Sequence, residues 1–243
     1  MMYDFANSSF TTIIVTVVYS VYFVNNVVGD VDLGSALWGR AVAISMLLVA
    51  ISAPIFGAVA DHSRAKKRFL FFHTYLTIIF TALLFFVRSG DISKGMFYFI
   101  IANFGFHSAN VFYNALLPEI VNRDKIGKIS GWGWAIGYFG GMLSLFIILP
   151  FIHNDLTRYV FPVVAFFFAI FSVFIFIWIK EVKAPSRPTN YFKVAYHRIR
   201  FSFQNIKKFT DLKKFIFSYF IYNDAITTII TFGAIFGKEE FAM

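Results

Sequence analysis

The chain has 243 residues, of which 58% are hydrophobic, 21% aromatic and only 14% charged. A soluble domain needs a polar surface around its core, so this composition argues against a soluble enzyme or binding domain. Cysteine is absent, which excludes disulfides and thiolate metal sites. A net charge of +9 could suggest nucleic acid. In a membrane chain, however, the placement of Lys and Arg is more informative than their sum. We therefore expect a lipid bilayer as partner and no nucleic acid.

Seven segments are long and apolar enough to cross a bilayer as helices, which takes about 20 residues each. Irregular backbone cannot lie in hydrocarbon because its polar groups would have no partners. The predicted fold class is an all-α polytopic membrane protein with seven transmembrane helices. The expected spans are Phe5–Val28, Leu37–Ala60, Phe69–Val87, Met96–Leu117, Trp132–Phe151, Tyr159–Ile179 and Phe215–Phe236.

Lys and Arg gather on one side of these spans. Seventeen of the 22 basic residues lie in three segments: after the second span, after the fourth span, and between Lys180 and Lys214. Because basic loops stay on the cytoplasmic side, the N-terminus and these three segments are predicted to be cytoplasmic.

The segment between the sixth and seventh spans differs from a simple loop. Pro185 and Pro188 end the sixth helix, and apolar residues then recur at steps of three and four between Phe192 and Phe209. This pattern predicts a basic amphipathic helix on the anionic inner leaflet, with a plain linker as the alternative. The expected domains are a six-helix lobe at 1–180, the basic linker at 181–213, and the first helix of a second lobe at 214–243.

The fourth span carries a row of polar side chains. Asn103, His107, Asn110 and Asn114 are spaced at four, three and four residues, which places them along one helix face, and Tyr113 lies beside them. Such a face in lipid indicates a polar cavity or a helix–helix seam. His107 could carry a proton. The plainer interpretation is that the amides only hold helices together.

The first and seventh spans carry further polar groups. Asp4 and Asn7 share a face of the first span, although Asp4 could simply cap the helix and complement its dipole. On the seventh span, Asn223, Asp224 and Thr227 form adjacent polar rows. Asp224 lies too deep to be a cap and is the candidate carboxylate for ion or proton coupling, with a buried structural hydrogen bond as the alternative.

The fifth span carries glycines at intervals of four, a spacing that lets two helices approach closely. The predicted packing residues are Gly133, Gly137, Gly140 and Gly141.

The turn between the second and third spans holds an acid four residues after a glycine, followed by a basic cluster. This arrangement predicts a gating contact that breaks when two halves of a transporter rock. Ordinary positive-inside topology is the alternative. The predicted gating residues are Gly57, Asp61, Arg64, Lys66, Lys67 and Arg68.

That turn resembles the signature of major facilitator superfamily transporters, although His62 and Arg64 depart from it. Four further motifs resemble the vacuole-effluxer branch of that superfamily, which includes autophagy-related amino-acid effluxers and bacterial relatives. These motifs are YDFANSSF at Tyr3–Phe10, FYNALLPEI at Phe112–Ile120, GWGWAIGYFGG at Gly131–Gly141 and YFIYNDAITTI at Tyr219–Ile229.

The resemblance implies a two-lobed, twelve-helix fold with alternating access, in which the first, fourth and seventh helices line a central cavity. Amino acids are the implied substrates, and a bacterial inner (cell) membrane is the implied location. The chain would then be the N-terminal portion of a secondary transporter of small solutes, with a separate chain as one source of the second lobe. A non-functional remnant and a seven-helix receptor-like protein are the alternatives. No nucleophile motif, paired acids or metal-ligand spacing indicates an enzyme, and no cofactor is expected.

Overall fold

The computed structural model describes residues 1–63, 65–179, 196, 200, 204 and 210–241, of which only the backbone is described at 58 and 61–63. The described residues form helices joined by short connections, with no strand among them. Among them, six helical segments are long and apolar enough to cross a membrane, and α5 is a further helix of 29 residues. The predicted all-helical polytopic membrane fold is confirmed.

The first span, Met2–Val28, is not a uniform α-helix. It alternates α1 (Met2–Ser9), the π-helix η1 (Phe10–Val17), α2 (Tyr19–Tyr22) and the π-helix η2 (Phe23–Val28). Gly29, at φ 76°, ends it in the left-handed conformation that glycine adopts without strain. The later elements are α3 (Val31–Ser63), α4 (Lys66–Leu83), η3 (Leu84–Phe86), α5 (Ile92–Ile120), η4 (Arg123–Lys125), α6 (Ile126–His153), α7 (Thr157–Trp178) and α9 (Thr210–Phe241).

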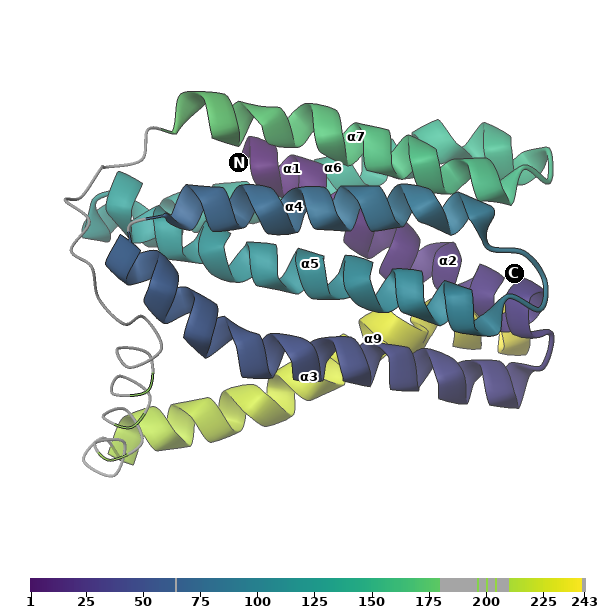
Figure 1. The fold of residues 1–243 in the computed structure, drawn as a ribbon, viewed down its shortest axis with the longest axis horizontal. Coiled ribbons are helices and arrows are strands. Elements are labelled where there is room, and N and C mark those ends of the chain that lie inside the picture. The colour runs from purple at the N-terminus through teal and green to yellow at the C-terminus, as the bar shows by residue number, and fades with distance from the viewer. Residues whose placement is uncertain (64, 180–195, 197–199, 201–203, 205–209, 242–243) are drawn as a thin grey trace.

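Helices α3, α4, α5 and α7 run roughly parallel along the long axis, with the first span behind α4 and α5 (Figure 1). One end of the bundle carries the N-terminus, the α3–α4 turn and the α5–α6 connection. We call it the basic end, because Lys66–Arg68, Arg123, Lys125 and Lys128 lie there.

The first span is the most enclosed, with half of its most apolar 18-residue stretch buried, against 11–44% for the other candidate spans. It packs against α5, α6, α7 and α9. Toward the end opposite the basic end, the Tyr19 hydroxyl donates to the Gly95 carbonyl at 3.0 Å and the Tyr22 hydroxyl to the Val87 carbonyl at 3.1 Å. Each buried phenol therefore has a backbone acceptor, as a dry interior requires.

The glycines of α6 bring its backbone against α1. A Cβ added to Gly137 would lie 2.8 Å from Ser8 Oγ, and one added to Gly140 would overlap the carbonyl oxygen and Cα of Phe5. Only hydrogen fits at Gly140, so this contact determines how closely the two helices approach. On the same helix, a Cβ at Gly131 would meet open space.

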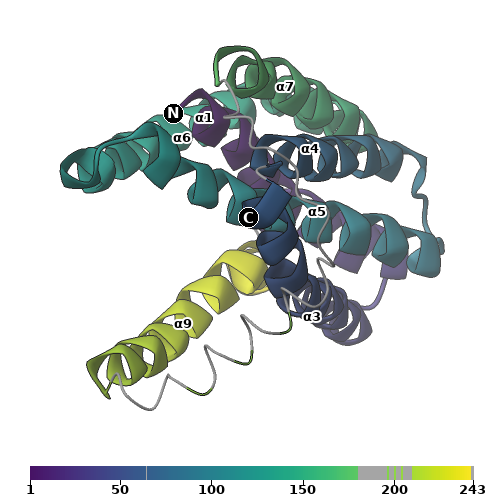
Figure 2. The ribbon, with the colours of Figure 1, turned by 60° about the vertical axis from the view of Figure 1, so that its left-hand side comes forward.

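Helix α9 is attached to the bundle by one half only. The Trp38 indole of α3 donates to the Thr231 carbonyl at 3.1 Å, and both Thr231 and Ile235 are buried. The preceding half, residues 210–225, is exposed along its length and leans away from the other helices (Figure 2). The predicted amphipathic helix between Phe192 and Phe209 lies outside the described residues, apart from residues 196, 200 and 204. That helix and the expected domain boundaries therefore stay predictions.

We predict that Gly140→Ala destabilises the protein while Gly131→Ala does not. Overpacking of this kind costs about 1–3 kcal/mol, and each kcal/mol lowers the melting temperature of a chain this long by roughly 2–4 °C. The measurement is the thermal unfolding midpoint of both detergent-solubilised variants and the parent. Equal midpoints for the two variants would contradict the close α1–α6 contact.

Candidate functional site

A pocket of about 110 Å³ lies where the first span, α3, α5 and α9 meet. Its polar side chains are Thr11 of the first span, Asn103 and His107 of α5, and Thr227 and Thr231 of α9. We call it the central pocket. The apolar remainder of its lining is Val15, Val42, Met46, Phe106 and Ile230. Three predicted site residues, Asn103, His107 and Thr227, are thus brought together.

Asn103 has an unmet hydrogen-bonding requirement in this pocket. Its side-chain nitrogen donates to Ser45 Oγ at 2.6 Å, while its Oδ1 is buried with no hydrogen-bond partner among the described residues. An acceptor left unpaired in an apolar interior costs about 1–3 kcal/mol, so such groups usually have a water or ligand as partner. The central pocket is therefore suited to a species that donates a hydrogen bond.

The first span and α5 run antiparallel with a regular register. Three contacts define this register: Asp4 with Tyr113, Asn7 with Asn110, and Phe10 with Phe106. Residue numbers rise along the first span as they fall along α5. Asn7 donates to Asn110 Oδ1 at 3.0 Å, and the two phenyl rings stack with centroids 4.8 Å apart. Asn7 and Asn110 therefore pair across a helix–helix seam.

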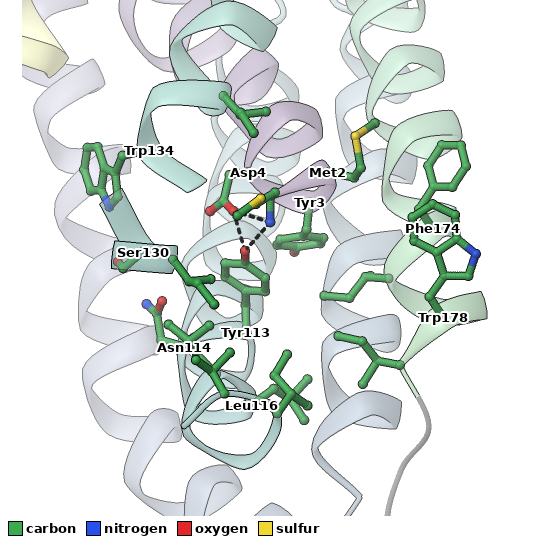
Figure 3. Close-up of a pocket in the computed structure, with 18 residues that line it drawn as sticks. Met2, Tyr3, Asp4, Tyr113, Asn114, Leu116, Ser130, Trp134, Phe174 and Trp178 are labelled. Carbon is green, nitrogen blue, oxygen red and sulfur yellow. Dashed lines mark hydrogen bonds and ion pairs between the residues drawn. The ribbon is translucent and has the colours of Figure 1, made fainter. Parts of the chain in front are cut away.

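A larger cavity, of about 430 Å³, opens at the basic end between α1, α5, α6 and α7 (Figure 3). We call it the basic-end cavity. The Tyr113 hydroxyl donates to Asp4 Oδ2 at its edge. The α-amino nitrogen of Met1 lies 3.0 Å from the same carboxylate oxygen. Met1 is the N-cap residue of α1, so this second contact is a local one at the helix start, and the helix-cap interpretation of Asp4 stays open beside its bond to Tyr113.

The remaining predicted polar residues lie apart from these contacts. Asn114 is exposed and lines the basic-end cavity without a hydrogen bond to Asp4. Asn223 and Asp224 are exposed on the half of α9 that leans away, and neither lines the two cavities. The alternative to a coupling role for Asp224 was a buried structural hydrogen bond, and the exposed side chain does not make one in this structure.

The α3–α4 turn contacts the ends of two other helices. Lys66 Nζ lies 2.8 Å from Glu119 Oε1 and 3.4 Å from the Ala115 carbonyl, near the end of α5. Lys67 Nζ donates to the Ile179 carbonyl just after α7, at 2.6 Å. Cations at helix C-termini satisfy free carbonyls and complement the dipole. Lys67 therefore caps α7, while Lys66 pairs with Glu119 in the last turn of α5.

The other residues of that predicted gate contribute less to the described contacts. Arg68 is exposed, and a Cβ on Gly57 would meet open space. The side chain of Asp61 and all of Arg64 lie outside the described residues. The gating role of this turn stays a prediction.

Several partners in these sites were not identified from the sequence. Ser45 bonds Asn103, Thr74 bonds the Tyr3 hydroxyl at 2.9 Å, and Trp38 holds α9. A lone Ser, Thr or Trp in an apolar span has no periodic signal, because its partner lies on another helix. Only a helix-packing hypothesis could have indicated these three residues.

Comparison with known proteins identifies the family. The family described as "Vacuole effluxer Atg22 like" matches residues 20–243, which is most of the chain. The chain belongs to this family. A curated relative from Bacillus subtilis (strain 168), the "Uncharacterized MFS-type transporter YxiO", is 26% identical over 260 aligned residues, covering 98% of this chain. The chain spans 59% of that relative's length. No solved structure matches.

The match confirms the family to which the sequence motifs pointed. The matched residues include the glycine-rich segment of α6 and the YNDAITT segment of α9, whereas Tyr3–Phe10 lies before them. Members of a vacuole-effluxer family and an MFS-type relative are described as transporters, which agrees with the polar seam inside this bundle.

We predict that Ser45→Ala destabilises the protein by about 1–3 kcal/mol, because it leaves the buried Asn103 amide without its acceptor. Ser52→Ala on the same helix is the control, since the Ser52 hydroxyl donates to the Val49 carbonyl of its own helix, at 3.4 Å, and to no other helix among the described residues. The measurement is the apparent free energy of unfolding in a mixed-micelle SDS titration. Equal losses for the two variants would contradict the importance of the Asn103–Ser45 bond.

Proposed function

We propose that this chain forms the first lobe, and the first helix of the second lobe, of a secondary active transporter for small solutes. Transport by alternating access exposes one central site first to one side of the membrane and then to the other. Amino acids are the first solute class to test, since the sequence resemblance implies them. The proposed orientation places the basic end in the cytoplasm.

The observation that carries this proposal is the central pocket. Side chains from three helices that are far apart in sequence, Thr11, Asn103 and Thr227, converge there inside a bundle of apolar helices. Polar groups at that depth are expensive in lipid, and they are typical of substrate and ion pathways. The Oδ1 of Asn103, which is buried and has no partner within the described part of the chain, supports a site that is filled by water or solute.

The position of α9 supports a movable closure of this pocket. Thr227, Ile230 and Thr231 form its α9 wall, and the Trp38–Thr231 bond attaches that wall to the lobe. Because α9 is the first helix of the proposed second lobe, this wall would move with that lobe during alternating access. Asp224, one turn before Thr227, is the proposed coupling carboxylate, and it would reach the rest of the transporter from the exposed face of α9.

The test is labelling of Asn103→Cys by a charged, membrane-impermeant methanethiosulfonate reagent. The chain has no cysteine, so a single introduced thiol gives no background. We expect labelling in both right-side-out and inside-out vesicles, because alternating access opens the pocket to each side in turn. Ile51→Cys, at a 61% exposed apolar position of the same helix bundle, is the lipid-facing control and should stay unlabelled.

Labelling of Asn103→Cys from one side only would favour a receptor-like protein over a transporter. Absence of labelling from both sides would indicate a sealed helix seam. Either result overturns the proposed function without requiring the substrate to be known.

A further inference from the structure

The basic-end cavity lies apart from the central pocket and has a different composition. Its volume of about 430 Å³ is in the usual range of small-molecule sites. The walls are mostly apolar, and they come from the ends of α5 and α7 and the start of α6. The apolar lining includes Leu116, Leu117, Ile120, Ile129, Ile175 and Trp178.

The charge in this cavity has one sign among the described side chains. Asp4 is the only charged side chain in the lining, which contains no Lys, Arg or His among the described residues. Apart from the α-amino group of Met1, the described lining offers no cation to a carboxylate or phosphate ligand. An ammonium group would gain an ion pair at the edge of a low-dielectric space.

Three features favour a carboxylate at this position. The Tyr113 hydroxyl donates to its Oδ2, and its position in the first turn of α1 lets the helix dipole favour negative charge there. Gly133 of α6 leaves the necessary room, since a Cβ at that position would lie 2.8 Å from Oδ2. The Tyr113 bond therefore orients the carboxylate, and the absence of a side chain at Gly133 gives it room.

One nitrogen atom lies against both of these oxygens in the structure. The α-amino nitrogen of Met1 lies 3.0 Å from Asp4 Oδ2 and 3.2 Å from the Tyr113 hydroxyl. The ammonium group of a ligand could displace the α-amino group of Met1, or it could bind the other oxygen of the Asp4 carboxylate. Figure 3 shows Asp4 beside Tyr113, with Trp134 and Trp178 among the other labelled residues of the lining.

We propose that the basic-end cavity binds an organic cation, an amine carried on an apolar body, through Asp4 and Tyr113. The ammonium group pairs with the Asp4 carboxylate and the apolar body lies against Leu116, Ile175 and Trp178. This binding site is separate from the central pocket and does not depend on the proposed transport function.

The test is binding of three probes of matched shape to the purified, detergent-solubilised chain: 2-phenylethylamine, 2-phenylethanol and 3-phenylpropionate. We expect 2-phenylethylamine to raise the thermal midpoint saturably and to change tryptophan fluorescence, because Trp134 and Trp178 line the cavity. The alcohol should act more weakly and the anion should have no effect. An amine that stabilises no better than the alcohol, or an anion that stabilises equally, would overturn the proposal.

Substitutions assign the effect to the cavity. Asp4→Asn should weaken binding of the amine by about tenfold to a hundredfold, as expected for loss of a charged hydrogen bond. Asp4→Glu keeps the charge and should retain most of the affinity, which separates loss of the ion pair from loss of fold. Asp155→Asn, in the turn between α6 and α7, is the matched control for removing an acid. Wild-type affinity in Asp4→Asn would overturn the proposal, whatever the outcome of labelling at Asn103.

Discussion

Polar side chains within an apolar helix bundle must find partners inside the protein, and this requirement places the first span at the centre. The span carries a carboxylate, an amide and hydroxyls that lipid cannot solvate. Asp4 takes its partner from Tyr113 and Asn7 from Asn110, both on α5. The antiparallel register between these two helices follows from those pairs, and the positions of the other helices depend on it.

The glycine face of α6 makes the same arrangement sterically possible. At Gly140 the α1 backbone is too close for any side chain, and at Gly133 the missing side chain leaves room for the Asp4 carboxylate. Close approach and polar pairing thus support each other along α1. Where the pairing ends, cavities remain: one beside Asn103 and His107, and one beyond Asp4 at the basic end.

Much of the architecture could be predicted from the sequence, because span length and helical period are local properties. The polar row on α5 and the glycine row on α6 were visible as spacings of three and four residues. The π-helical turns of the first span were not, since they change the period without a distinctive composition. The partners of Asn103 and Tyr3 were also hidden, because Ser45 and Thr74 belong to other helices.

The exposure of Asp224 illustrates a different limit. An acid ten residues into an apolar helix indicates a polar environment, but the sequence does not say what provides it. In the structure the other described helices leave that part of α9 uncovered, so they do not supply a partner face for Asp224. The proposed role of Asp224 depends on contacts outside these helices, whereas the proposed roles of Asn103 and Asp4 depend on residues within them.

The pairing of the first span with α5 is tested most directly by cross-linking in native membranes. The cysteine-free chain allows a double variant, Asn7→Cys with Asn110→Cys, to be treated with a short bifunctional methanethiosulfonate. The pairing predicts efficient intramolecular cross-linking of this variant, read as protection from a second thiol label and as a linked peptide by mass spectrometry. The control combines Asn7→Cys with Val111→Cys, whose position on α5 is exposed. Equal cross-linking of both variants, or none in the first, would contradict the account.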